Sequence, residues 1–159
     1  MSQIAEAAEI SESTFFRYFA TKEATVLEDD FDAPLAMSLA AQPADLPMVP
    51  ALRRAVREVF SSAGASGIAE LQERTRMIFE VPELRDAMAG RIMSTLTDAS
   101  RMLAARAGRS PDDFRIRVMA GAMIGAMIGV TMAPVEGGPS GYLERIDAAL
   151  AELESGISL

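Results

Sequence analysis

The sequence contains no cysteine, no histidine and a single lysine, Lys22. Without cysteine the chain forms no disulfide bond and has no reactive thiol, a composition compatible with a reducing cytoplasm. Without histidine it lacks the commonest general base and the commonest metal ligand. The remaining carboxylates and hydroxyls show no paired-carboxylate spacing and no phosphate-binding loop. We therefore expect neither an enzyme nor a metal or other cofactor site.

Positive charge is also scarce, since 15 basic residues stand against 23 acidic ones and give a formal net charge of −8 at pH 7. This balance argues against a protein that binds nucleic acid over its whole surface. Half of the 159 residues are apolar, so the chain can bury a core and is not expected to be disordered. No N-terminal signal peptide is visible, and we expect a cytoplasmic protein.

Hydrophobic periodicity predicts an all-α chain. Apolar residues recur at spacings of three and four, and no stretch alternates as a strand would. Loops are expected over residues 42–50, which contain three prolines, over residues 64–67 and over residues 134–141. Pro82 suits the first turn of a helix, and Gly108 is expected to close that same helix.

The stretch "SESTFFRYFATKE", residues 11–23, concentrates four aromatic side chains near the N-terminus. A short helix is expected just before it, over residues 3–8. Ser11 is a good N-cap for a second helix that ends near Phe19, and Thr21 for a third. Two short helices joined by a tight turn form a helix-turn-helix.

The second of these helices is expected to turn Phe15 and Phe19 inward and its polar residues outward. An ordinary helical hairpin within a bundle is the alternative. The residues that we expect to contact DNA are Ser13, Thr14 and Arg17 in the major groove and Phe16, Tyr18 and Lys22 on the sugar-phosphate backbone.

The segment "IAEAAEISESTFFRYFATKEATVL", residues 4–27, resembles the helix-turn-helix of the tetracycline-repressor (TetR) family of bacterial transcription regulators. The resemblance implies a TetR-like all-α fold, operator DNA as a partner and a homodimer. It divides the chain into a partial helix-turn-helix domain over residues 1–32 and a ligand-binding and dimerisation domain over residues 33–159. The segment "FEVPELRDAM", residues 79–88, resembles the subgroup that binds acyl-CoA-like ligands and includes regulators beside mycofactocin genes.

Two features depart from the family pattern. Glu9 stands where the family usually has glycine, and a left-handed residue with a Cβ costs about 1 kcal/mol or more there. The amphipathic helix that the family places before the motif is missing, and residues 1–32 carry two basic and eight acidic residues. We therefore expect weak or no DNA binding by this chain. Either its true start lies further upstream or it is a degenerate member.

Residues 118–135, "VMAGAMIGAMIGVTMAPV", carry no charge. A membrane span is one interpretation. The run is short, ends near a proline and has no flanking aromatic belt, so a buried helix of a soluble protein is preferred. Its glycines lie on one stripe and its methionines on the opposite side.

The glycine stripe predicts close packing on the last helix and on a second subunit, which would give a four-helix bundle. Packing within one chain is the alternative. The expected dimer interface consists of Gly121, Gly125, Gly129, Leu143, Ile146, Leu150 and Leu153.

The methionine side predicts an adaptable apolar ligand site, with a plain hydrophobic core as the alternative. The expected lining residues are Phe60, Met77, Phe79, Met88, Met119, Met123 and Met127. Three arginines near the Pro82 kink would bind an anionic head, unless they are solvated surface charges; they are Arg74, Arg76 and Arg85.

These features together predict a ligand-responsive transcriptional repressor that is released from operator DNA by a hydrophobic small molecule, which the second resemblance implies to be acyl-CoA-like. The alternative is a dimeric small-molecule-binding protein that has lost DNA binding, and the acidity of residues 1–32 is the feature that favours it.

Overall fold

The computed structural model describes residues 2–28, 31–132 and 138–157, and within these ranges the chain is helical and contains no strand. The all-α prediction is confirmed. The described helices are α1 (Ser2–Ala7), α2 (Glu12–Tyr18), α3 (Ala24–Leu27), α4 (Asp32–Ala41), α5 (Met48–Glu80), α6 (Pro82–Ala107), α7 (Phe114–Thr131) and α8 (Gly138–Ser155).

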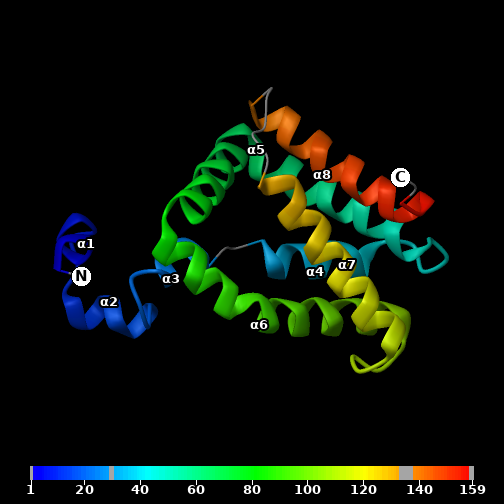
Figure 1. Ribbon diagram of the computed structural model, residues 1–159, viewed down its shortest axis with the longest axis horizontal. Coiled ribbons are helices and arrows are strands. Elements are labelled where there is room, and N and C mark those ends of the chain that lie inside the picture. The colour runs from blue at the N-terminus through cyan, green and yellow to red at the C-terminus, as the bar shows by residue number, and fades with distance from the viewer. Residues whose placement is uncertain (1, 29–30, 133–137, 158–159) are drawn as a thin grey trace.

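The helices form a small N-terminal unit and a larger body (Figure 1). Helices α1 and α2 pack on each other, and α3 packs on α5 and α6. In the body, α5 packs on α4, α6 and α8, and α7 packs on α6 and α8. Helix α3 therefore lies where the N-terminal unit meets the body.

Helix α5 carries a sharp bend at Gly64, whose φ of 67° and ψ of −179° are not helical. The turn predicted over residues 64–67 is corrected to this one residue, because the helix resumes directly after it. Glycine adopts this conformation readily since it has no Cβ. The predicted loop over residues 42–50 is also shorter, because α5 begins at Met48 and Pro50 fits in its first turn, where a missing N–H costs nothing.

The predicted boundaries of α6 are confirmed. Pro82 is its first residue. Gly108 follows its end in the left-handed conformation, with a φ of 60°, and donates its N–H to the carbonyl of Ala104. A left-handed glycine is the common way to satisfy the last carbonyls of a helix.

The hydrophobic core lies between α5, α8 and the helices that pack on them. Its largest fully buried side chains include Leu52, Leu103, Ile146 and Leu150. Ile146 and Leu150 were expected at a dimer interface, but their exposed fractions are 0% and 2%, so neither has surface left for a partner. We correct both assignments, because the apolar side of α8 packs against its own chain. Helical spacing predicts that a residue is buried, but it does not predict which helix or subunit covers it.

An ion-pair network joins α5 to α8. Arg53 binds the carboxylate of Asp147 through two hydrogen bonds, from Nε to Oδ1 at 3.0 Å and from Nη2 to Oδ2 at 2.8 Å. Its Nη1 donates to Glu154 at 2.7 Å, and Arg57 also donates to Asp147 at 2.7 Å. Hydrogen bonding from Arg53 is the main cause that lowers the pKa of Asp147 to about 2, and Arg57 adds to it against the opposing effect of burial.

A second arginine fixes the end of α4. The guanidinium of Arg106, on α6, donates hydrogen bonds at 2.7–3.1 Å to the carbonyls of Leu39, Gln42, Pro43 and Leu46. The last carbonyls of a helix have no partner within the helix. Arg106 therefore satisfies groups at the end of α4 and in the following loop, and holds both against α6.

We predict that Asp147→Asn lowers the free energy of unfolding by about 1–2 kcal/mol at neutral pH. Because the folded-state pKa of Asp147 lies below its unfolded value, its contribution is present above about pH 4 and is lost as the pH falls toward 2. Urea unfolding of both proteins at neutral pH and near pH 3 measures this difference.

The matched control is Glu152→Gln, which neutralises an exposed acid on the same helix outside the network. The difference in free energy of unfolding between wild type and Asp147→Asn should be smaller near pH 3 than at neutral pH. Glu152→Gln should have a free energy of unfolding close to that of wild type at both pH values. A gap that is the same at both pH values would contradict the role assigned to the charge of Asp147.

Candidate functional site

The turn between α1 and α2 contains the left-handed residue that the sequence suggested. Glu9 has a φ of 55° and is the one non-glycine residue with positive φ in the described ranges. The N–H of Glu9 donates to the carbonyl of Glu6, and that of Ile10 donates to the carbonyl of Ala5. The glutamate thus closes α1 in a conformation that glycine would adopt at lower cost.

The predicted cap at Ser11 is confirmed, whereas the N-cap position of α3 is Glu23 and Thr21 reaches the start of this helix from two residues earlier. The side-chain oxygen of Ser11 accepts a hydrogen bond from the backbone N–H of Thr14 at 3.1 Å. It also lies 2.9 Å from the hydroxyl oxygens of Ser13 and Thr14. The hydroxyl of Thr21 accepts a hydrogen bond from the N–H of Ala24 at 3.2 Å, at the start of α3.

The aromatic residues of α2 divide between a small core and the surface. Phe15 is 2% exposed and contacts the rings of Phe16 and Phe19, with ring centres 5.6 and 5.5 Å away. Phe16 and Tyr18 are 52% and 67% exposed. The structure therefore leaves both rings on the surface where DNA contact was expected, together with the exposed Ser13 and Arg17 and the half-buried Thr14.

The two basic groups of this unit are accessible. Arg17 lies over the ring of Tyr18, with 5.1 Å between the guanidinium carbon and the ring centre. The side chain of Lys22 is 60% exposed and lies 3.7 Å from Glu23. An exposed ion pair of this kind is weak, so Lys22 can exchange it for a phosphate.

A cavity of about 580 Å³ opens between α3 and the helices of the larger body. Both halves of the bent α5 contribute to its wall. Five of the seven side chains predicted to line it do so: Phe60, Phe79, Met88, Met123 and Met127. The sequence also missed lining residues from α3, from α4 and from the N-cap position before α4, including Val26, Leu27, Phe31 and Leu35, because these helices are too short to show a clear periodicity.

Met77 and Met119 do not line the cavity, and we correct both predictions. Met77 lies two residues before Phe79, which places it on the other side of α5. Met119 lies one turn before Met123 and packs against the hydrophobic core instead.

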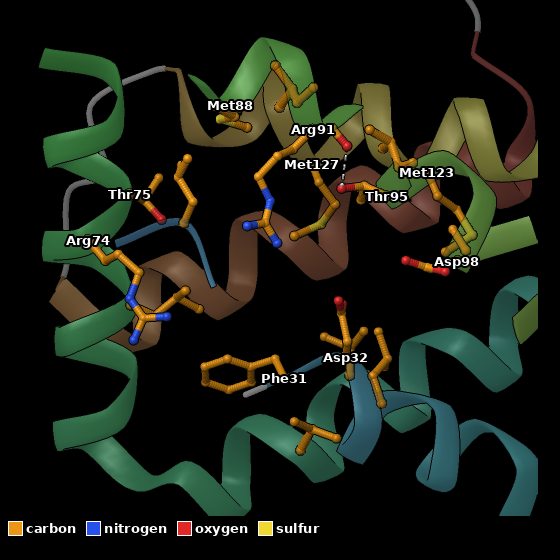
Figure 2. Close-up of a pocket in the computed structure, with 18 of the residues that line it drawn as sticks. Phe31, Asp32, Arg74, Thr75, Met88, Arg91, Thr95, Asp98, Met123 and Met127 are labelled. Atoms are coloured by element: carbon orange, nitrogen blue, oxygen red, sulfur yellow. Dashed lines mark hydrogen bonds between the residues drawn. The ribbon is translucent and has the colours of Figure 1, made fainter. Parts of the chain in front are cut away.

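The polar side chains at the cavity are Asp32, Arg74, Thr75, Arg91, Thr95 and Asp98 (Figure 2). Of the three arginines predicted there, Arg74 is present. Arg76 pairs with Glu73 and Glu80 along the exposed side of α5, and Arg85 donates to the carbonyl of Phe79 at 3.3 Å.

Arg91 was not among the predicted lining residues, although the spacing along α6 carries a signal for it. Arg91 lies three residues after Met88 and four before Thr95, so all three belong to one face of α6. Figure 2 shows its guanidinium directed into the cavity between Arg74 and Asp98. Within the described ranges, no three histidine, cysteine or acidic residues are grouped so as to hold a metal ion.

Comparison with family models identifies both parts of the chain. Residues 1–28 match the model described as bacterial regulatory proteins, tetR family, and residues 46–158 match the MftR C-terminal domain. The second match alone spans more than half of the chain. The chain belongs to the TetR family. Among curated proteins, none matches it.

Both resemblances found in the sequence are thereby confirmed. The chain is a TetR-family transcriptional regulator, and its C-terminal part is of the mycofactocin-regulator type. The α1–α2 pair is the helix-turn-helix of this regulator, and the cavity lies in the part that matches the MftR domain, with additional walls from α3 and α4.

The glycine stripe of α7 is uncovered in this TetR-family chain. Gly121, Gly125 and Gly129 are exposed, and a Cβ added at any of them would meet no atom within 4 Å. The expected packing of this stripe on the last helix is therefore corrected. The neighbouring Phe114 is 80% exposed, and Val118 is exposed as well.

The remaining predicted interface residues, Leu143 and Leu153, are half-buried against the core. As for the membrane alternative, no helix in the described part of the chain has the length and apolar character needed to span a bilayer. Residues 133–135 of the uncharged run, and residues 134–137 of the predicted loop over 134–141, lie outside the described residues. The rest of that predicted loop is corrected, because α8 begins at Gly138.

Proposed function

We propose that this TetR-family regulator is a cytoplasmic repressor that binds operator DNA as a dimer and is released by an amphiphilic effector. The observation that carries the proposal is the cavity of about 580 Å³, because residues of α3 form part of its wall. Helix α3 is also the element where the N-terminal unit meets the larger body. An effector in this cavity would contact the junction directly.

The chemistry of the lining supports an effector with a long apolar part. Met88, Met123 and Met127 come from two helices and adapt to different apolar shapes. Arg74 and Arg91 supply positive charge at the same cavity. An apolar tail with an anionic head, of which an acyl-CoA is one example, matches both features and agrees with the MftR-type domain.

The mechanism that we propose is a shift between two arrangements of the chain. The effector must bind one arrangement more tightly than the other, since otherwise it shifts nothing. We place the boundary between the moving parts near residue 32, with residues 1–32 as the DNA-binding domain and residues 33–159 as the ligand-binding and dimerisation domain. The alternative, a dimeric ligand-binding protein without DNA binding, is favoured by the two basic against eight acidic residues in the first part.

We propose that α2 reads operator DNA with Ser13, Thr14 and Arg17, while Phe16, Tyr18 and Lys22 contact the backbone. Lys22→Ala should weaken binding of all sequences about equally and reduce the slope of log affinity against log salt by roughly 1, because one phosphate contact is lost. Ser13→Ala should leave that slope unchanged and alter sequence preference. Fluorescence anisotropy with selected oligonucleotides measures both effects.

A salt slope that is the same for Lys22→Ala and wild type would show that Lys22 lies away from the phosphates. Absence of binding to any sequence by the intact regulator would favour the alternative function.

We propose that the dimer forms through the uncovered glycine face of α7, with the flanking half-buried Leu143 and Leu153 of α8 at its edge. Exposed apolar surface of this extent commonly marks a protein interface. The absence of side chains at Gly121, Gly125 and Gly129 allows a second helix to approach closely, and the exposed Phe114 and Val118 extend the same face.

Gly125→Leu should convert the dimer to monomer while leaving the protomer folded. The added side chain meets no atom of its own chain within 4 Å, but it would occupy the space needed by the partner helix. Light scattering after size exclusion measures the mass, and circular dichroism verifies the helical content. Gly90→Leu, at an equally open glycine on α6, is the matched control and should stay dimeric. A stable dimer in Gly125→Leu would locate the interface elsewhere.

A blocked cavity should abolish the response to ligand. Ala99 lines the cavity, whereas Ala89 is exposed on the same helix away from the lining, so Ala99→Trp and Ala89→Trp form a matched pair. Dodecanoyl-CoA at about 100 times its Kd should raise the Tm of wild type and Ala89→Trp by several degrees and leave Ala99→Trp unchanged. Full stabilisation of Ala99→Trp would mean that the ligand binds outside the cavity.

A further inference from the structure

The two arginines of the cavity contact the same residue, Glu28. The Nη1 group of Arg74, on α5, donates to the backbone carbonyl of Glu28 at 2.9 Å. The Nη1 group of Arg91, on α6, lies 3.6 Å from the Glu28 carboxylate. Glu28 directly follows α3 and donates its own N–H to the carbonyl of Ala24. Both arginines that line the cavity therefore hold the residue that follows α3.

These contacts tie the junction helix to the body. Helix α3 has only four residues, Ala24–Leu27, and packs on α5 and α6. Its Val26 and Leu27 line the cavity. Beyond these apolar contacts, the two guanidinium groups are the charged links from α5 and α6 to the end of α3. A ligand that takes over the contacts of Arg74 and Arg91 therefore weakens the attachment of α3 to α5 and α6.

The contact to the Glu28 carboxylate is weak enough to be exchanged. Its distance of 3.6 Å is longer than a hydrogen bond, and the side chains of Arg91 and Glu28 are 44% and 49% exposed. Exposed ion pairs contribute little, whereas a fully placed anion can accept shorter charge-assisted hydrogen bonds from guanidinium groups. A ligand held in the cavity by its tail can therefore displace this carboxylate.

The other charged groups at the cavity restrict where an anionic head can sit. Asp98 lies two turns beyond Arg91 on α6 and pairs with Arg101 at 2.9 Å. Asp32 projects into the cavity from the start of α4 (Figure 2). Both carboxylates repel an anion, so the favourable position lies beside Arg74 and Arg91, next to α3.

We propose that the anionic head of the effector binds Arg74 and Arg91, where it displaces the backbone carbonyl of Glu28 from Arg74 and the Glu28 carboxylate from Arg91, while its apolar tail fills the methionine-lined cavity. This exchange releases the end of α3 from α5 and α6 and so transmits binding to the helix-turn-helix. The inference depends on the proposed function. It adds the site of the anionic head, at Arg74 and Arg91, and identifies Glu28 as the residue of the protein that competes for this site. The shared ligand chemistry is an anion on an apolar chain, either a carboxylate or a phosphate-bearing thioester.

Competition is tested by measuring the affinities of dodecanoate and the neutral dodecanol. Arg91→Gln should weaken dodecanoate binding roughly tenfold, through the loss of a charge-assisted contact, and leave dodecanol unchanged. Glu28→Gln should tighten dodecanoate binding several-fold, because the competing carboxylate is gone, and again leave dodecanol unchanged. Affinities for dodecanoate and for dodecanoyl-CoA that are both unaltered by Glu28→Gln would overturn the inference.

Release of α3 is tested by hydrogen exchange at the backbone amides of Leu27 and Glu28, which are bonded to Glu23 and Ala24. Dodecanoate should accelerate exchange in wild type, and dodecanol should not. Glu28→Gln should exchange fast without ligand. Glu70→Gln is the matched control, because Glu70 lies 3.4 Å from Arg74 but does not belong to α3. Glu70→Gln should show the same acceleration of amide exchange by dodecanoate as wild type. If it does not, the effect of Glu28→Gln reflects the removal of a negative charge near the arginines and not the loss of a contact to α3.

The two sources of the anion are separated by adding dodecanoyl-CoA. A response of α3 to dodecanoate alone assigns the site to a carboxylate, and a response to dodecanoyl-CoA alone assigns it to the phosphate-bearing thioester. Either response supports the exchange. If no amphiphile binds wild type, the proposed function itself fails. If dodecanoate and dodecanol each bind wild type and every variant with the same affinity, the exchange with Glu28 is wrong, whereas the proposed function is not affected.

Discussion

The backbone conformation of Gly64 is the constraint on which the rest of this structure depends. With a φ of 67° and a ψ of −179°, it turns α5 sharply after its first half. Residues with a Cβ adopt this conformation only at a cost of about 1–3 kcal/mol. Because α5 bends here, Phe60 before the bend and Arg74 after it both reach the same cavity. A straight helix would leave the cavity without one of these walls.

Because of the bend, the two halves of α5 contact different helices and are held by different interactions. The first half of α5 is fixed to α8 by the buried seam around Ile146 and by the bidentate pair of Arg53 and Asp147. The second half reaches α3, where the hydrogen bond from Arg74 is joined by the longer ion pair of Arg91 with Glu28. A body held by strong contacts and a junction held by exchangeable ones suit the proposed mechanism, in which the DNA-binding part moves when the effector binds.

The features predicted correctly from the sequence are mostly local ones. Ser11 as an N-cap, Pro82 at the start of α6 and Gly108 after its end depend on the few residues around them. Ile146 was expected at a dimer interface but is buried in its own chain, because the side of α8 that faces α5 is set by the tertiary structure. The spacing along α6 places Arg91 on the same face as Met88, but the fact that this face borders a cavity depends on the bend of α5 and on the position of α3, which that spacing does not encode.

The most direct test of the proposed coupling between the cavity and the helix-turn-helix is a distance measurement in the proposed dimer. Since the chain contains no cysteine, Gln3→Cys on the exposed side of α1 provides one unique spin-label site per protomer. Pulsed electron paramagnetic resonance then measures the separation of the two labels. We predict one distance distribution for the free protein and a shifted one when dodecanoate or dodecanoyl-CoA is bound. An unshifted distribution in a protein saturated with the bound amphiphile would contradict the account.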